Sequence, residues 1–276
     1  MILDKNIIFI LCILCIFILC IFILCIIYHY NIINNICNKS LDFYIYNGEN
    51  IDDMTKTIMI IGGTHGNEPA GTIAIKNLIY KLNSKKIKLK QNRLILVPYV
   101  NYCALKLNKR YVNLLGDINR KYPDNTNNTN KINNINKKIL ELMDQSDFVL
   151  DFHEAIGYYR EDAGSIGSSI IPTDTSVSYD VANILYENIN KTISNDNLYK
   201  KFIILTNNNN LINEDTNKYG KNIDIKKTLR YYANLINKDY ILIETTGQRN
   251  IQPIHIRVEQ SKIFIDCVLK YYNSFE

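Results

Sequence analysis

His65 and Glu68 are the first residues of this chain whose types and spacing favour chemistry. They follow the apolar residues 58–61 and the pair Gly62-Gly63, so they fall between a predicted strand and a predicted helix. Because the two residues are three positions apart, their side chains can converge on one point, as a metal ion requires. Imidazole nitrogen with carboxylate oxygen suits zinc better than copper(I) or an iron–sulfur cluster. Taken alone, the pair has a second interpretation, a histidine at a helix start with a glutamate that favours the helix dipole.

A second histidine, His153, closes another apolar stretch, residues 148–152. One interpretation is a core histidine held by hydrogen bonds. We expect it instead to face the point between His65 and Glu68, with Asp151 or a backbone carbonyl orienting its ring. Two histidines and one carboxylate leave the fourth position of a tetrahedral zinc for water, as in hydrolytic sites. The sequence therefore predicts one zinc ion per chain on these three residues.

A third apolar stretch, residues 240–243, ends at Glu244. Buried beside zinc, this carboxylate would accept a proton from water and pass it to a leaving nitrogen. The alternative is an ordinary surface carboxylate at the end of a strand. Glu154 competes for the same role, but neighbours on a strand point to opposite faces. We therefore expect Glu154 to point away from the site that His153 faces.

The pattern of apolar residues predicts the elements that position these side chains. Strands are expected at residues 41–46, 57–61, 93–98, 148–152 and 240–243, with a turn at Asn47-Gly48 after the first. Helices are expected at residues 73–82, 135–143, 177–190, 226–237 and 258–272, and Asn-rich loops at 124–134 and 206–222.

This alternation of strands and helices predicts an α/β fold, a mixed, mostly parallel sheet with helices on both faces. In such sheets ligands bind at the carboxyl ends of the strands. His65, His153 and Glu244 all fall at such ends.

Residues 7–27 form an almost unbroken run of Ile, Leu, Phe and Cys, long enough to span a bilayer as a helix. The alternative is a secretory signal, but the run exceeds an ordinary signal core and no small-x-small cleavage site follows. We predict a single-pass membrane anchor at residues 1–30, a polar tether at 31–40 and a catalytic domain at 41–276. The orientation of the anchor in the membrane stays open, because few charges flank the apolar run on either side.

The net charge of +5 is mild for 276 residues and is spread over Lys-rich surfaces. No basic patch interleaved with aromatic residues indicates nucleic-acid binding. After the anchor, about 235 residues remain, enough for one sizeable core. The expected partners are therefore a small substrate and, through the N-terminal helix, a membrane, with no nucleic acid.

Four motifs together resemble the zinc carboxypeptidase superfamily. They are His65-Gly-Asn-Glu68 after Gly-Gly-Thr, Asp-Ile-Asn119-Arg120, Asp-Phe-His153 and the strand-borne Glu244. Within the superfamily the chain is most similar to the succinylglutamate desuccinylase/aspartoacylase group, over about residues 57–250.

The resemblance implies a role for each of these positions. It assigns His65, Glu68 and His153 as zinc ligands and Glu244 as the catalytic glutamate. It further implies that Asn119 and Arg120 bind the substrate carboxylate and that Arg110 stabilises the oxyanion, tasks that suit the planar arginine fork.

The expected activity is zinc-dependent hydrolysis of an amide, on an N-acyl amino acid or a similar small amide with a free carboxylate. One alternative is a metallocarboxypeptidase that removes C-terminal residues from peptides. Another is a catalytically inactive, membrane-anchored binding protein, which the presence of ligands, base and arginines disfavours.

Overall fold

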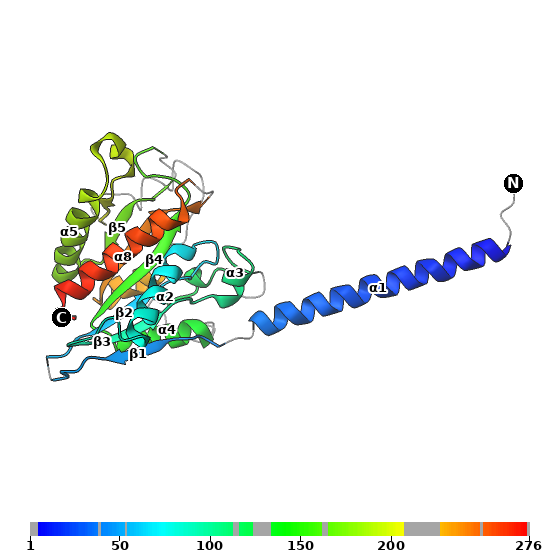
Figure 1. Cartoon of the computed structure of the whole chain (residues 1–276), viewed down its shortest axis with the longest axis horizontal. Helices are drawn as coiled ribbons and strands as arrows, with labels where there is room; N and C mark the ends of the chain where they lie inside the picture. The colour runs from blue at the N-terminus through cyan, green and yellow to red at the C-terminus, as the bar shows by residue number, and fades with distance from the viewer. Residues whose placement is uncertain are drawn as a thin grey trace. The chain divides into compact units, whose positions relative to one another are not determined.

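The protein is described by a computed structural model that covers residues 5–37, 40–52, 54–112, 116–123, 134–161, 165–206, 227–248 and 251–274. It divides into two units, Met1–Lys39 and Ser40–Glu276. The first contains helix α1 (Lys5–Cys37), and the second contains a sheet with helices around it (Figure 1).

Helix α1 includes the segment Ile13–Ile32, which is long and apolar enough to cross a membrane, a test that a signal sequence also passes. The helix continues through residues 31–37, where the sequence predicted a polar tether. Because each added residue extends an existing helix with one more hydrogen bond, the mixed Asn and Ile residues there remain helical.

The strands of the second unit form one seven-stranded sheet in the order β1-β3-β2-β4-β7-β5-β6. The bounds are β1 (Tyr44–Asn47), β2 (Thr57–Ile61), β3 (Arg93–Val97), β4 (Phe148–Ala155), β5 (Ser169–Pro172), β6 (Ile203–Ile204) and β7 (Asp239–Thr246). The pairs β2–β3, β2–β4, β4–β7 and β5–β6 are parallel, whereas β1–β3 and β5–β7 are antiparallel. The predicted mixed, mostly parallel sheet is confirmed.

Helices cover both faces of this sheet. Side chains of α2 (Pro69–Asn83), α5 (Ser176–Lys191) and α8 (Ile254–Tyr271) pack in one apolar cluster, and Figure 1 shows these helices on the same side. Side chains of α4 (Asn134–Asp144) and α7 (Leu229–Leu235) pack in a second cluster on the opposite face. The short helix α3 (Tyr102–Lys106) follows β3, and two 3-10 turns occupy Ile118–Arg120 and Asn195–Lys200.

Strand β4 shows how the two faces are divided. Phe148, Leu150 and Phe152 enter the cluster of α2, α5 and α8. Val149 enters the cluster of α4 and α7. Since successive strand residues point to opposite faces, His153 lies on the α4–α7 face and the residue after it on the α2–α8 face.

Three features differ from the sequence-based expectation. The predicted turn at Asn47-Gly48 is wrong, because Asn47 is the last residue of β1 and pairs with Arg93 of β3. The N–H of Gly48 then donates to the C=O of Asn92, so the chain continues beside the segment that precedes β3. Helices α2 and α8 begin four residues early. Pro69 takes the first position of α2, which suits proline, and Pro253 directly precedes α8 as its N-cap. Helix α3 and strand β6 were not predicted, because five residues are too few for a helical period and two are too few for a strand period. Strand β5 was not predicted, because it is Ser-Ile-Ile-Pro and proline is rare inside strands.

The two predicted Asn-rich loops, residues 124–134 and 206–222, lie almost entirely outside the described residues.

Candidate metal centre

The loop between β2 and α2 carries His65 and Glu68, and its glycines fix its path. Gly63 has a φ of 64°, a left-handed conformation that glycine adopts without strain. A Cβ on Gly66 would lie 1.9 Å from the backbone of Ala104, so only glycine lets this loop pack on α3. The result buries His65 in the loop and Glu68 directly before the first turn of α2, each 2% exposed.

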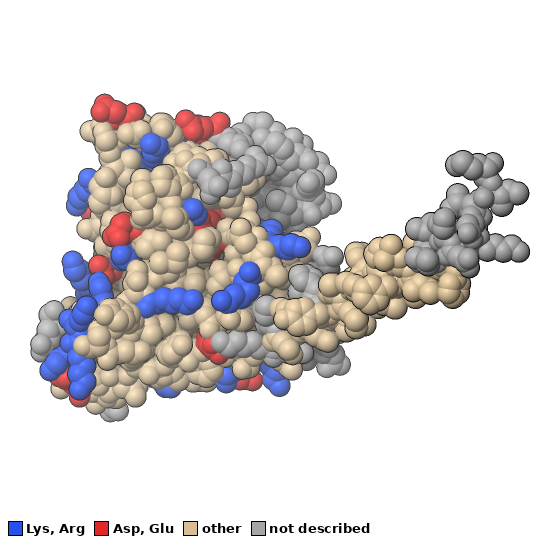
Figure 2. Space-filling model, turned by 45° about the vertical axis from the view of Figure 1, so that its right-hand side comes forward, with Lys and Arg blue, Asp and Glu red and all other residues tan. Residues whose placement is uncertain are grey.

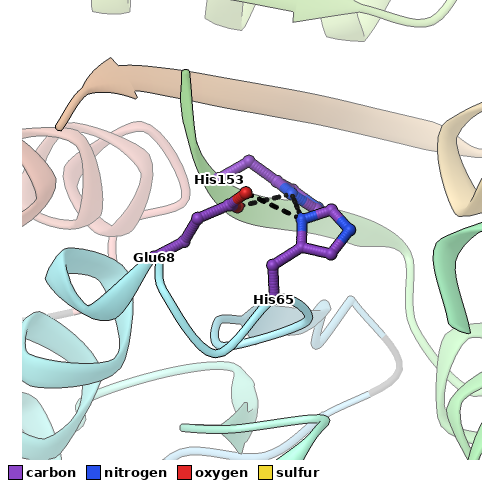
Figure 3. Close-up of side chains that lie close together, drawn as sticks. All are labelled: His65, Glu68 and His153. Carbon is purple, nitrogen blue, oxygen red and sulfur yellow. Dashed lines mark hydrogen bonds and ion pairs between the residues drawn. The ribbon is translucent and has the colours of Figure 1, made fainter. Parts of the chain in front are cut away.

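His65, Glu68 and His153 converge on one buried point (Figure 3). His65 Nδ1 lies 2.8 Å from Glu68 Oε1, and His153 Nδ1 lies 3.0 Å from Glu68 Oε2. The two Nδ1 atoms are 3.2 Å apart. Two donors held about 2.0–2.1 Å from a tetrahedral zinc ion lie about 3.3 Å apart, so this donor set fits zinc.

The other ring nitrogen of each histidine faces a carboxylate. His65 Nε2 lies 3.2 Å from Asp117 Oδ1, and His153 Nε2 lies 3.5 Å from Asp151 Oδ2. Asp151 in turn accepts a hydrogen bond of 2.7 Å from the hydroxyl of Tyr240. A carboxylate behind a ligand histidine holds the proton on the far nitrogen and leaves Nδ1 free to bind a cation. The expectation that Asp151 lies behind His153 is confirmed.

The ionisable groups at the centre shift one another's pKa. Burial raises the pKa of Glu68, but His65 and His153 outweigh burial and lower it to about 2. Burial lowers the pKa of His153, whereas Asp151 and Glu68 raise it well above the usual value. The carboxylates around His153 thus favour a positive charge at the point where the three donor atoms meet. A divalent cation would supply that charge, and ligand imidazoles bind it in the neutral form.

Arg110 lies at the edge of the centre, half-buried. Its Nη1 donates to Glu68 Oε1 over 3.1 Å, and its Nη2 lies 3.5 Å from Asp117 Oδ2. The arginine therefore supplies a positive charge beside the donor atoms without replacing any of them.

Asn119 and Arg120 lie in the 3-10 turn Ile118–Arg120, and Asp117 is the residue that caps its start. Asp117 Oδ1 accepts from the backbone N–H of Asn119 over 3.0 Å, and Asn119 Oδ1 accepts from the N–H of Leu229 at the start of α7. Burial raises the pKa of Asp117, but His65, Arg110 and Arg120 together hold it below its usual value. Both arginines thus act electrostatically on the carboxylate that contacts His65.

Glu244 lies beside His153 in the parallel register of β4 and β7. The two residues share one face of the sheet, and Glu244 is 8% exposed. Burial raises the pKa of Glu244 to about 8, against a lowering by His153 and with a further raise from Glu68. A carboxyl that titrates near neutral pH suits a group that both accepts and returns a proton.

Glu154 points away from the centre, as predicted. Its Oε1 accepts from the N–H of Ala70 over 2.6 Å, and its Oε2 pairs with Nη1 of Arg257 on α8. The alternation of β4 thus gives the two neighbouring residues, His153 and Glu154, different surroundings.

Two residues at the centre received no role from the sequence. Asp117 contacts His65, and Gln248 donates from Nε2 to Glu68 Oε1 over 3.0 Å. Asp117 is the first residue of the motif Asp-Ile-Asn119-Arg120, and Gln248 follows Glu244 by four positions. A polar residue at a strand end or a turn start is the feature that would have drawn attention to them.

A family model for the succinylglutamate desuccinylase/aspartoacylase catalytic domain matches residues 54–159, which contain all three candidate ligands. This segment of the chain is therefore similar to the catalytic domain of that family, in agreement with the resemblance drawn from the sequence. Proteins of the succinylglutamate desuccinylase/aspartoacylase group and their structural relatives hydrolyse amide or peptide bonds. No curated protein sequence matches the chain.

Three solved structures share the fold. Cell shape determinant protein Csd4 from Helicobacter pylori, with product bound, has a TM-score of 0.67 at 21% identity, covering 85% of this chain and 56% of Csd4. An aspartoacylase family protein from Mesorhizobium loti has a TM-score of 0.57 at 18% identity, covering 86% and 63%. A succinylglutamate desuccinylase from a Silicibacter species has a TM-score of 0.56 at 16% identity, covering 86% and 61%. The chain thus spans less than two thirds of the length of each of these three proteins.

Proposed function

We propose that the chain is a zinc-dependent amide hydrolase acting on an N-acyl amino acid or a similar small amide with a free carboxylate. The observation that carries this proposal is the convergence of two imidazole nitrogens and one carboxylate at a single buried point, with His153 beside Glu244 in the sheet. We assign one zinc ion per chain to His65, Glu68 and His153.

Bound zinc would polarise the scissile carbonyl and lower the pKa of an attacking water. Glu244 takes the proton of that water and delivers it to the leaving nitrogen. Its burial beside His153 supports this role, because burial raises the pKa of Glu244 to about 8 and so makes it a stronger proton acceptor than an exposed carboxylate. The guanidinium of Arg110, which donates a hydrogen bond to Glu68, faces the negative charge that develops on the carbonyl oxygen.

Asn119 and Arg120 hold the free carboxylate of the substrate. An arginine fork pairs with a carboxylate through two parallel hydrogen bonds, which fixes orientation as well as charge. The position of their turn supports this assignment, because its start is capped by Asp117, whose carboxylate contacts His65. A carboxylate bound there would stand next to the amide under attack.

A metallocarboxypeptidase that removes C-terminal residues from peptides is the second candidate. It is favoured by the higher TM-score with Csd4, which is a D,L-carboxypeptidase, than with the two acylase-type structures. Both candidates require a free carboxylate beside the scissile amide, so they share the proposed chemistry and differ in the other side of the substrate.

Matched substrates test the proposal. The zinc-loaded protein is assayed with N-acyl amino acids and with short peptides, each as the free acid and as the amide. We expect hydrolysis of the free acids, its loss in the amides, and its loss after chelation of the metal. Faster turnover of peptides would favour the carboxypeptidase. Equal hydrolysis of acids and amides would overturn carboxylate recognition, and absence of metal-dependent hydrolysis would overturn the function.

We further propose that residues 1–30 anchor the enzyme in a membrane, with residues 31–40 as a tether and 41–276 as the catalytic domain. Large apolar side chains of α1 such as Phe17 and Leu24 are more than 60% exposed. After Lys5 at its start, the helix has no Lys, Arg, Asp or Glu as far as Cys37, and Figure 2 shows the described side chains of this helix without charge colours. Such a continuous apolar surface is stable in a bilayer and unfavourable in water.

A further inference from the structure

A buried ion pair lies on the other face of β4, behind the metal centre. Arg257, near the start of α8, pairs through Nη1 with Oε2 of Glu154. The two residues are 4% and 1% exposed, and the proposed mechanism uses neither. A charge held out of water is tolerated only where its partner is closely fixed, so this pair strongly constrains its surroundings.

The main chain of Glu154 holds the carboxylate of Glu68. The N–H of Glu154 donates to Glu68 Oε2 over 3.1 Å. The C=O of Glu154 accepts from Nε2 of Gln248, and the same nitrogen donates to Glu68 Oε1 over 3.0 Å. Both oxygens of the candidate ligand are therefore held by groups whose positions depend on Glu154.

The side chain of Glu154 also holds the backbone near Glu68. Its Oε1 accepts from the N–H of Ala70, in the first turn of α2, and Glu68 is the residue directly before that helix. An anion is stabilised at a helix N-terminus by the free N–H groups and the helix dipole. The placement of Glu154 thus fixes Glu68 at both its carboxylate and its backbone.

Gly247 provides the room for the ion pair. A Cβ on Gly247 would lie 1.8 Å from Oε2 of Glu154 and 2.1 Å from Nη1 of Arg257. No side chain fits there while the pair is formed. The next residue, Gln248, donates a hydrogen bond to Glu68. Gly247 therefore leaves space for the ion pair, and the residue after it holds the candidate ligand.

We propose that Arg257 is a positioning residue for the metal centre: by holding Glu154 it sets Glu68 in place to bind the ion. This inference rests on the proposed zinc function, because it concerns the same ion. Residues behind a metal ligand typically change metal affinity by about 10–100-fold when replaced. Loss of Arg257 should therefore weaken zinc binding, beyond any loss of folding stability.

The test compares Arg257→Met with Arg230→Met in the full chain, purified in detergent micelles. Arg230 is a matched control, a buried arginine on α7 that donates to the C=O of Pro172 over 2.9 Å. Zinc dissociation constants are measured by competition with a chromophoric chelator, and melting temperatures are measured on the metal-free protein. Both variants should melt earlier, but only Arg257→Met should weaken zinc binding, by about 10–100-fold, while Arg230→Met stays within about twofold of wild type.

A second variant, Arg257→Lys, keeps the test possible if Arg257→Met does not fold. Lysine keeps the charge but not the fork, so it should bind zinc more weakly than wild type and more tightly than Arg257→Met. Zinc affinities of both Arg257 variants equal to wild type, with lowered melting temperatures, would overturn the inference and leave the metal centre intact. Failure of the wild type to bind zinc would overturn the proposed metal centre, and the inference with it.

Discussion

Replacing Glu244 by Gln tests the proposed mechanism most directly, because it removes the proton-accepting group and keeps its shape. Glu244 lies beside His153 in the sheet register and is 8% exposed, so the amide of glutamine occupies the same buried place. The three candidate zinc ligands are untouched, and zinc should remain bound.

The expected loss has a defined size. General-base catalysis contributes about 10²–10⁴-fold, which corresponds to about 2.7–5.4 kcal/mol of activation free energy. Turnover should fall by at least that range with zinc retained.

The same variant should change how the stability of the metal-free protein depends on pH. Burial raises the pKa of Glu244 from 4.5 to about 8, so its contribution to stability is present below pH 4.5 and is lost as pH rises through 8. At 1.36 kcal/mol for each pH unit between those values, the loss approaches about 4–5 kcal/mol. Glutamine does not ionise, so Glu244→Gln avoids this loss. The metal-free variant should therefore be more stable than the metal-free wild type between pH 5 and pH 9.

Two assays measure these effects. Steady-state kinetics at saturating zinc compare wild type, Glu244→Gln and Glu154→Gln, the last being a buried carboxyl on the opposite face of β4. Thermal melts of the chelated proteins at several pH values follow stability. Near-normal turnover in Glu244→Gln, with loss of turnover in zinc-saturated Glu154→Gln, would refute the assignment of the base. Parallel melting curves at every pH would refute the burial argument.

Three further predictions concern the metal, the substrate and the anchor. Replacing His65 or His153 with Ala should abolish zinc binding and largely preserve the fold, as measured by elemental analysis and circular dichroism; full zinc occupancy in the double variant would remove them from the site. Arg120→Ala should chiefly raise KM for the free-acid substrate, with poor rescue by Lys, whereas Arg110→Ala should lower kcat; an unchanged KM in Arg120→Ala would contradict the clamp. The full chain should stay in membranes after alkaline carbonate washing, and deletion of residues 1–30 should release it with activity; extraction of the full chain would argue against a membrane-spanning anchor.

The residues that the structure brings together at the centre were accessible from sequence because their positions depend on local patterns. His65 follows a strand and two glycines, and His153 and Glu244 end apolar stretches. A strand period of two also predicted that Glu154 would face away, and its contacts with Ala70 and Arg257 confirm this. Local periodicity fixes which side of a strand a residue occupies.

What the sequence did not reveal depends on contacts between distant segments. Arg257 is one basic residue in a helix, and nothing in its neighbours indicates that it is buried against Glu154, 103 positions away. Strand β6 has two residues, too few for any period, and exists because β5 offers it a parallel partner. The turn at Asn47-Gly48 was wrong for the same reason, since the choice of β3 as partner for β1 is made by the assembled sheet.

The register of the central strands has a consequence for how the protein acquires its activity. His65 and His153 are separated by 88 positions, and β2, β4 and β7 must pair in parallel before Glu244 stands beside the second histidine. Parallel pairing over such separations requires the closure of long loops, which is slow and occurs late in folding. No short segment of the nascent chain contains the whole donor set. We therefore expect the proposed zinc ion to bind late, to a chain that has already completed its central sheet.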